Sequence, residues 1–317
     1  MQNQCLGLAE ALGLPVVLKR LVVRWPWRWL LPRMWPVPLA ALSPHGDVLA
    51  PPWPRLLIAT GRMSVAPAIA VRRASAGATF TVQIQDPGVP PDGFDLVVAP
   101  RHDRITGPNV IKSIGALHRV TPARLAAAAA AFAPSLVHLP RPLVAVLVGG
   151  NNRSYRFDVA TAEKLGDQLA AIVRVHGAGL AVTVSRRTSA NATDALRRKL
   201  HGLPAQLWDG TGPNPYFGYL GLADAIVVTC DSVSMVSEAA STGKPVYVFD
   251  VPGFSRKFAA FHDGLRNAGI TRQFAGRLDT WSYAPLDDTS VVAAEVRRRL
   301  QLPPLADPAS PSVLQRA

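Results

Sequence analysis

Hydroxyl and carboxylate side chains gather in residues 226–250, IVVTCDSVSMVSEAASTGKPVYVFD. The pattern predicts a buried strand, a helix that begins near Ser232, and a second strand after Gly243. Free backbone N–H groups at such a helix start suit a phosphate or pyrophosphate. Glu238 follows Ser234 by four residues, so both lie on one helix face, and its carboxylate could accept both hydroxyls of a ribose. We predict a nucleotide site formed by Asp231, Ser232, Ser234 and Glu238; a capped helix with a solvated Glu238 is the alternative.

Two more loops rich in hydrogen-bond donors follow apolar runs in the same half of the chain. They are VGGNNRSY, residues 148–155, and TVSRRTS, residues 183–189. Parallel strands end at one edge of their sheet, where ligands bind, so we expect both loops to meet the segment at Asp231. Neither a GxGxxG nor a Walker A pattern occurs, which disfavours an NAD site or a P-loop. The candidate binding residues are Gly149, Gly150, Asn151, Arg153, Ser185, Arg186 and Arg187.

Three polar loops in the N-terminal half also follow apolar runs: ATGRMS (59–64), QIQDP (83–87) and APRHD (99–103). We expect them to line the side of an inter-domain cleft that faces the nucleotide. A general base for an acceptor hydroxyl must hold a proton near neutral pH, which suits histidine, whereas aspartate needs burial or a neighbouring charge. The candidates are Asp86, His102 and Asp103; for each, a hydrogen bond that only fixes the loop is the alternative.

Short apolar runs alternate with helical patterns in both halves, which is typical of two α/β domains with open parallel sheets. Strands are expected at 15–21, 55–59, 79–84, 95–99 and 109–114, and then at 143–148, 180–184, 206–208, 225–229 and 245–249. The chain opens on a helix at 4–12, so the N-terminal domain is expected to lack its first strand. Prolines near residue 140 predict an acceptor-side domain at 1–140, a nucleotide-binding domain at 141–302 and a flexible tail at 303–317.

The charge balance favours anionic partners, and an Ala- and Arg-rich proteome composition without a specific partner is an equal alternative. The 34 basic and 21 acidic residues give a formal net charge of +13, which suits nucleotide phosphates, nucleic acid or acidic lipids. The two cysteines, Cys5 and Cys230, form no metal-ligand or disulfide pattern, so we expect a reducing, cytoplasmic compartment. No run of about 20 apolar residues is present, so no membrane span is expected.

Tryptophan and basic residues are mixed in KRLVVRWPWRWLLPRMWP, residues 19–36, which holds five basic residues, four tryptophans and no acid. This mixture is typical of membrane interfaces and would suit a lipid-linked acceptor and a peripheral position at the inner membrane. Pro26, Pro32 and Pro36 exclude one long helix, so packing within the protein is an equal alternative. Nucleic-acid binding is disfavoured because no known nucleic-acid module accompanies the segment.

The arrangement in residues 226–250 resembles the donor half of GT-B glycosyltransferases, the class of lipid A disaccharide synthase and Kdo transferase. An ordered set of motifs resembles the mitochondrial-fission Elm-type family: NQCLGLAEALGLP, KRLVVRWPWRW, ATGR, QIQDP, APRHD, GALHRVT, VGGNNRSY, SRRTS and DSVSMVSEAASTGKPV. That family includes bacterial proteins of uncertain activity and plant proteins that recruit the fission machinery. Its members typically begin with a further strand and a D-G-x-x-G-type loop.

The resemblance implies a GT-B-like α/β fold, with two Rossmann-like domains facing across a cleft. It implies ribose binding by Glu238 and phosphate contacts by Asp231, Ser232 and Ser234. The expected function is transfer of a sugar from a nucleotide-sugar donor to an envelope or lipid-linked acceptor, with a nucleoside diphosphate as ligand and no tightly bound cofactor. No DxD-like pair is evident, so no metal is required, and Arg153 and Arg187 could neutralise the leaving diphosphate. A non-catalytic scaffold that acts through protein contacts is the rival; the sequence does not indicate the oligomeric state.

Overall fold

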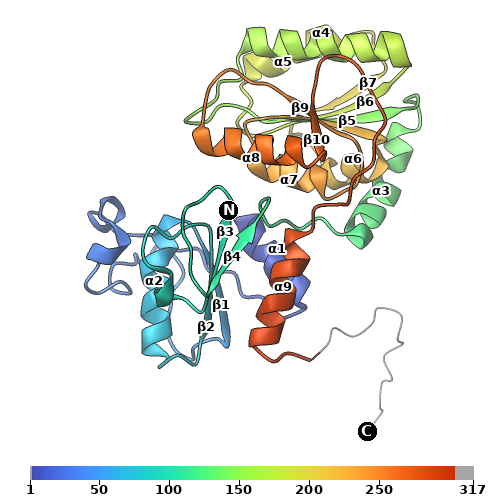
Figure 1. The fold of residues 1–317 in the computed structure, drawn as a ribbon. Coiled ribbons are helices and arrows are strands. Elements are labelled where there is room, and N and C mark those ends of the chain that lie inside the picture. The colour runs from blue at the N-terminus through green and yellow to red at the C-terminus, as the bar shows by residue number, and fades with distance from the viewer. Residues whose placement is uncertain (1, 304–317) are drawn as a thin grey trace. The chain divides into compact units, whose positions relative to one another are not determined.

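The chain folds into two compact α/β units, and the computed structural model describes residues 2–303 (Figure 1). Unit 1 contains residues 2–99, Ile105–Lys112 and the described residues from Thr289 onward. Unit 2 contains Pro100–Arg104 and Ser113–Asp288. Each unit has its own sheet with parallel strands and packed helices, so the predicted class of two Rossmann-like α/β units is confirmed. Apart from Pro303, the predicted tail at 303–317 lies outside the described residues.

The chain leaves unit 1 well before residue 140 and returns to it at its last helix. Helix α3 (Pro122–Leu136) belongs to unit 2, where it packs against α6 (Tyr216–Leu222). Gly218 permits this close approach, since a Cβ at that position would lie 2.7 Å from the Phe132 ring. Helix α9 (Asp288–Arg299) packs in unit 1, where the Arg299 guanidinium donates to the Asp95 carbonyl at 3.0 Å. The acceptor and nucleotide roles of the two domains stay predictions.

Unit 1 is built on a four-stranded sheet in the order β1-β2-β3-β4, in which β1, β2 and β3 run parallel. Its strands are β1 (Leu56–Thr60), β2 (Phe80–Ile84), β3 (Leu96–Pro100) and β4 (Val110–Ser113). Its helices besides α9 are α1 (Gln2–Leu12) and α2 (Arg62–Ala74), with 3₁₀ turns η1 (Trp27–Trp29), η2 (Pro32–Met34) and η3 (Pro91–Gly93). Val65, Phe94 and Val97 are buried between α2 and the sheet, which fixes the helix on one sheet face.

The strand expected at residues 15–21 does not form, and β1 is the edge strand of its sheet. Residues 15–21 and β1 line the same largely apolar cavity of about 1040 Å³, together with residues of α1. An extended segment becomes a strand only when a neighbouring strand satisfies its backbone groups. Residues 15–21 line this cavity and pair with no strand, so they form no strand themselves despite their β-like composition.

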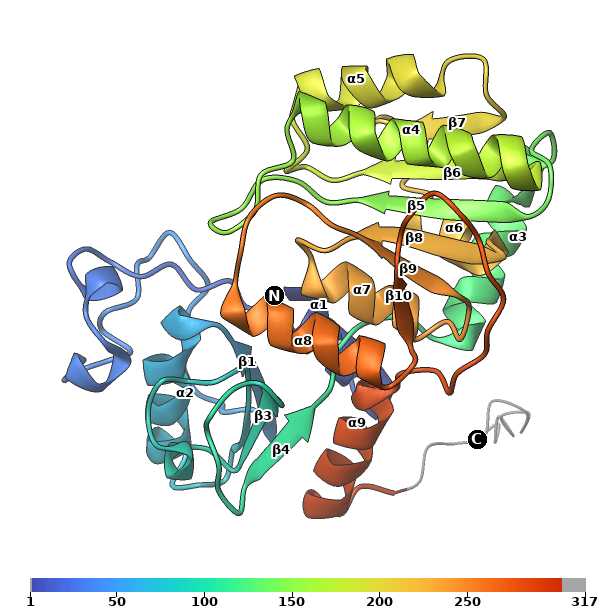
Figure 2. The ribbon, with the colours of Figure 1, turned by 45° about the horizontal axis from the view of Figure 1, so that its top comes forward.

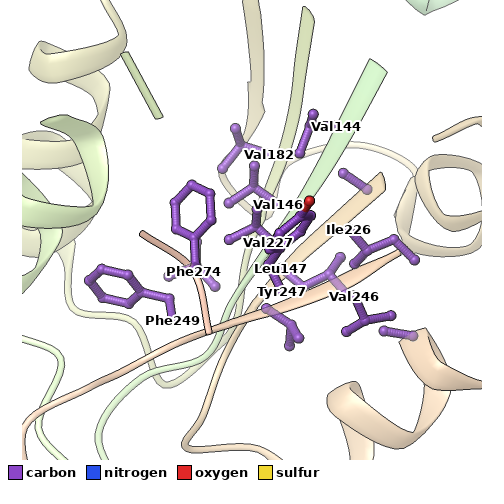
Figure 3. Close-up of a cluster of buried hydrophobic side chains, with 14 of the residues drawn as sticks. Val144, Val146, Leu147, Val182, Ile226, Val227, Val246, Tyr247, Phe249 and Phe274 are labelled. Atoms are coloured by element: carbon purple, nitrogen blue, oxygen red, sulfur yellow. The ribbon is translucent and has the colours of Figure 1, made fainter. Parts of the chain in front are cut away.

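Unit 2 contains a six-stranded, wholly parallel sheet in the order β10-β9-β8-β5-β6-β7. The strands are β5 (Leu143–Val148), β6 (Gly179–Val184), β7 (Ala205–Trp208), β8 (Ala225–Thr229), β9 (Val246–Phe249) and β10 (Thr271–Gln273). Their valine-rich runs form a buried core, part of which is shown in Figure 3. The chain starts at β5, moves outward to β7 and then returns to β8 on the other side of β5. Doubly wound sheets bind ligands at this reversal of strand order, outside the carboxyl ends of the strands.

The described helices of unit 2, apart from α6, begin where the sequence supplies a capping side chain. Thr121, Asp158, Ser189, Ser232 and Ser255 each accept a hydrogen bond from an N–H in the first turn of the helix that follows. Those helices are α3, α4 (Val159–His176), α5 (Ala190–Leu200), α7 (Val233–Ala240) and α8 (Arg256–Asn267). Figures 1 and 2 show α4 and α5 on one face of the sheet and α7 and α8 on the other. Helix α8 and strand β10 were not predicted from the sequence pattern.

Candidate functional site

Three loops meet at the carboxyl edge of the unit 2 sheet, as their positions after β5, β6 and β8 predict. We call residues 149–155 loop A, residues 185–189 loop B and residues 230–232 loop C. The Gly149 N–H donates to Thr229 Oγ1 at 2.8 Å, and the Ser185 hydroxyl donates to the Gly149 carbonyl at 2.8 Å. The Asn151 N–H donates to the Arg187 carbonyl at 3.1 Å. Loop A is therefore hydrogen-bonded to the end of β8 and to loop B.

Loop A approaches its neighbours so closely that only glycine fits at two positions. A Cβ at Gly149 would lie 2.1 Å from an Asp231 carboxylate oxygen, and one at Gly150 would lie 2.2 Å from the Arg187 backbone. Both glycines are buried. Their role in this structure is thus to let loops A, B and C share one small region of the sheet edge.

Asp231 of loop C is a buried carboxylate that contacts both loop A and loop B. Its side chain has no exposed surface and accepts from the Gly150 N–H at 3.0 Å and the Thr229 hydroxyl at 2.6 Å. It also forms an ion pair with Arg187 at 3.0 Å. The predicted phosphate contact by Asp231 does not fit this geometry, because a buried carboxylate is an acceptor and would repel a phosphate. Its place in the structure is that of a positioning residue.

The three candidate arginines on these loops are exposed. Arg187 has 40% of its side chain exposed while one of its nitrogens pairs with Asp231. A guanidinium carries five N–H donors, so the Arg187 group is oriented by Asp231 and retains donors toward solvent. Arg153 and Arg186 lie on the same loops, and within residues 2–303 neither forms an ion pair with an acidic side chain.

Helix α7 begins beside these loops. The Ser232 hydroxyl accepts from the Met235 N–H at 3.4 Å, as an N-cap does. Ser234 lies in the first turn and is half-buried. N–H groups of a first helical turn have no intrahelical acceptor, so the start of α7 offers donors next to Arg187 and loop A.

Glu238 lies on α7 and is 7% exposed, which rules out the alternative of a solvated glutamate. The Tyr216 hydroxyl, at the start of α6, donates to Glu238 Oε2 at 2.5 Å. Burial raises the pKa of Glu238 to about 7, against the opposing effect of the hydrogen bond from Tyr216. Burial and the neighbouring carboxylate also raise the pKa of Tyr216 well above its ordinary value. No sequence motif indicates Tyr216, which lies 22 residues before its partner.

The three candidate general bases do not belong to one unit. Asp86 lies in unit 1, is exposed, and accepts from the Gly88 N–H at 2.8 Å in a local turn. His102 and Asp103 belong to unit 2, where Asp103 is buried and pairs with Lys257 at 2.6 Å. Gln85, which directly precedes Asp86, has a φ of 75°, which non-glycine residues seldom adopt. A role in proton transfer stays a prediction for Asp86, His102 and Asp103.

Within residues 2–303, no group of three or more His, Cys, Asp or Glu side chains is placed to hold a metal ion. None of the helices in the same part of the chain combines the length and hydropathy that crossing a bilayer requires.

The family model described as "Mitochondrial fission ELM1" matches residues 1–300. The chain belongs to this family. An Arabidopsis thaliana relative in the ELM1 family, "Mitochondrial fission protein ELM1", is 37% identical over 274 residues, which are 78% of this chain and 64% of that protein. The chain therefore spans 64% of the length of this relative. An uncharacterized protein of Rickettsia prowazekii is 28% identical over 289 residues, covering 78% of this chain and 80% of its own. The resemblance based on the ordered motifs is confirmed.

A solved structure shares the fold. The UDP-GlcNAc 2-epimerase of Methanocaldococcus jannaschii superimposes with a TM-score of 0.54 over 78% of this chain and 77% of its own, at 13% identity. At that identity the likeness concerns the fold alone. This ELM1-family chain therefore shares its fold with that epimerase.

Proposed function

We propose that unit 2 of this ELM1-family chain binds the nucleoside diphosphate portion of a nucleotide-sugar at the carboxyl edge of β5, β6 and β8. The observation that carries the proposal is a buried acceptor, Glu238, on the helix whose first turn adjoins loops A and B. Neither feature is needed to stabilise an ordinary α/β sheet. Together they supply an acceptor for a ribose and donors for phosphates.

Glu238 suits the ribose because an ionised carboxylate is an acceptor with two oxygens. A ribose presents two adjacent hydroxyls, which can donate to both oxygens at once. The Tyr216 hydroxyl already donates to one of them. Ribose binding therefore adds donors to a carboxylate that burial has left poorly solvated, which strengthens each hydrogen bond.

We infer that the diphosphate binds at the start of α7, near Ser232 and Ser234. The N–H groups of the first helical turn and the positive end of the helix dipole attract an anion there. Arg187, held by Asp231, adds a charged donor. Gly149 and Gly150 keep loop A free of side chains, and Arg153 and Arg186 supplement the positive charge. These donors could stabilise a leaving nucleoside diphosphate without a metal ion.

We further propose that the protein transfers the sugar to an envelope or lipid-linked acceptor. The fold shared with a UDP-GlcNAc epimerase supports nucleotide-sugar chemistry. In such a transfer Asp86, His102 or Asp103 would remove the proton from the acceptor hydroxyl as it attacks the anomeric carbon, and the nucleoside diphosphate would leave. The rival is a non-catalytic adaptor of the same fold, which the name of the Arabidopsis relative, a mitochondrial fission protein, favours.

A thermal-shift series with nucleoside diphosphates and UDP-GlcNAc tests the binding step. A ligand at about 100 times its Kd stabilises the folded protein by about 2.7 kcal/mol. The Glu238→Ala variant should lose most of the shift, whereas Asp263→Ala, which removes an exposed carboxylate of unit 2, should keep it. Absence of a shift with every nucleotide would refute the proposal. Nucleotide binding without release of UDP, when lipid extracts are offered as acceptors, would favour the adaptor.

A further inference from the structure

The segment of tryptophan and arginine in unit 1 folds into an ordered arm, residues 22–42, that lies beside α2. Val23 and Leu42 form an antiparallel bridge that closes it. Figures 1 and 2 both show the arm in blue as a projection from the sheet of unit 1. It contains the turns η1 and η2.

One side of the arm is packed against α2. Trp35 is 5% exposed and forms a cluster with Ala66 of α2, which Trp27 joins with its ring 6.3 Å from that of Trp35. The Arg62 guanidinium donates to the carbonyls of Arg28 and Leu30 at 2.8 and 3.1 Å. The arm therefore has a fixed conformation, and packing within the protein explains two of its four tryptophans.

The other two tryptophans are not explained by packing. Trp25 is 74% exposed and Trp29 is 71% exposed. Four more large apolar side chains of the arm have more than two fifths of their surface exposed: Val22, Leu31, Met34 and Val37. Exposed large apolar residues scattered singly are ordinary, but a group on one short arm marks an interaction site.

The charge of the arm narrows the kind of partner. Arg24, Arg28 and Arg33 are exposed between the apolar residues, and the Arg28 guanidinium lies 5.6 Å from the Trp29 ring centroid. No acidic residue occurs between Glu10 and Asp47. Trp with aliphatic side chains suits the boundary between headgroups and acyl chains, and arginine suits anionic headgroups.

We propose that the arm docks unit 1 onto an anionic lipid surface, with Trp25 and Trp29 inserted at the headgroup level and the three arginines on the headgroups. A single-stranded nucleic acid would also use aromatic and basic groups, but it needs a groove that follows its backbone, whereas Trp25 and Trp29 project from an arm flanked by aliphatic side chains. The proposal is independent of the nucleotide site, because it concerns unit 1 and is measured without nucleotide.

Co-sedimentation with phosphatidylcholine vesicles, with and without phosphatidylglycerol, tests the proposal. The full chain should bind the anionic vesicles, and binding should weaken as salt rises. The double variant Trp25→Ser, Trp29→Ser should lose at least tenfold in affinity. Its matched control is Val137→Ser, Val175→Ser, which removes two apolar side chains of unit 2 that are 84% and 71% exposed; this control should bind like the unmodified chain. Changing Arg24, Arg28 and Arg33 to Gln should cost about fivefold each on anionic vesicles.

A second readout separates insertion from loose electrostatic attraction. Brominated acyl chains should quench part of the tryptophan emission of the bound protein, and the quenching should disappear in the Trp25→Ser, Trp29→Ser variant. Three results would each overturn the proposal: no binding to anionic vesicles, equal binding by the Trp variant and the valine control, or binding to a labelled oligonucleotide by a chain that ignores vesicles.

Discussion

Glu238 gives nucleotide binding a pH dependence that follows from its burial. Its pKa of about 7 in the ligand-free protein means that the carboxyl is largely protonated at mildly acidic pH. The ribose hydroxyls donate to the ionised form, so binding favours ionisation and lowers the pKa in the complex. With a pKa near 7, about 3% of the carboxyl is ionised at about pH 5.5 and about 90% at about pH 8. The affinity should therefore rise about 30-fold across this range, or about 2 kcal/mol, and level off above it.

Isothermal titration calorimetry with UDP-GlcNAc measures this dependence. The sugar blocks the terminal phosphate, which in a free nucleoside diphosphate would itself titrate near pH 6. Glu238→Gln should bind more weakly with an almost constant affinity over the range, and Asp263→Asn should behave like the unmodified chain. Tyr216→Phe removes a hydrogen bond that lowers the pKa of Glu238, so its midpoint should move to higher pH. A flat profile for the unmodified chain, or an unchanged slope in Glu238→Gln, would refute the reasoning.

Three further predictions concern the stability of the two units. Gly149→Ala, whose Cβ would lie 2.1 Å from Asp231, should lower the free energy of unfolding by about 3 kcal/mol in urea titrations. Its control is Gly264→Ala on α8, where nothing lies within 4 Å of the new methyl group. This control should leave the free energy of unfolding unchanged or raise it by about 0.5 kcal/mol. Asp231→Ala should cost about 3 kcal/mol, because the Gly150 N–H and Arg187 lose a buried partner; a cost below 1 kcal/mol in the same titration would contradict its positioning role. In unit 1 burial alone would raise the pKa of Asp95, but hydrogen bonds from Arg72 and Thr81 outweigh burial and lower it. The stability that Asp95 contributes is thus present above its unfolded pKa of about 4 and is lost as pH falls through its lower folded value. Asp95→Asn should therefore flatten the acid limb of a curve of unfolding free energy against pH. An unchanged acid limb would show that other groups control it.

The sequence predicts the sheet of unit 2 closely because its strands are buried on both faces. Leu143–Val148 and Ala225–Thr229 form the strands at the residues that their apolar runs indicate. Fully buried parallel strands appear in the sequence as continuous apolar runs. Asp158 likewise indicates the start of α4, because it is a typical N-cap residue. In contrast β10, with three residues at the edge of the sheet, carries too short a pattern to be detected.

Features that depend on distant partners could not be predicted. Residues 15–21 have the composition of a strand, but they face a cavity and have no strand beside them. The meeting of loops A, B and C follows from the rule that parallel strands end at one edge. The direction of each side chain does not follow from it: Asp231 turns inward to hold Arg187, and Glu238 meets a tyrosine from another helix.

A crystal structure of the protein with UDP-GlcNAc would show whether Glu238 binds the ribose. Both ribose hydroxyls should lie at about 2.6–3.2 Å from the Glu238 carboxylate, and the diphosphate should lie at the first turn of α7 with Arg187 as a donor. Nucleotide bound away from the carboxyl edge of β5, β6 and β8, with Glu238 still joined only to Tyr216, would contradict this prediction.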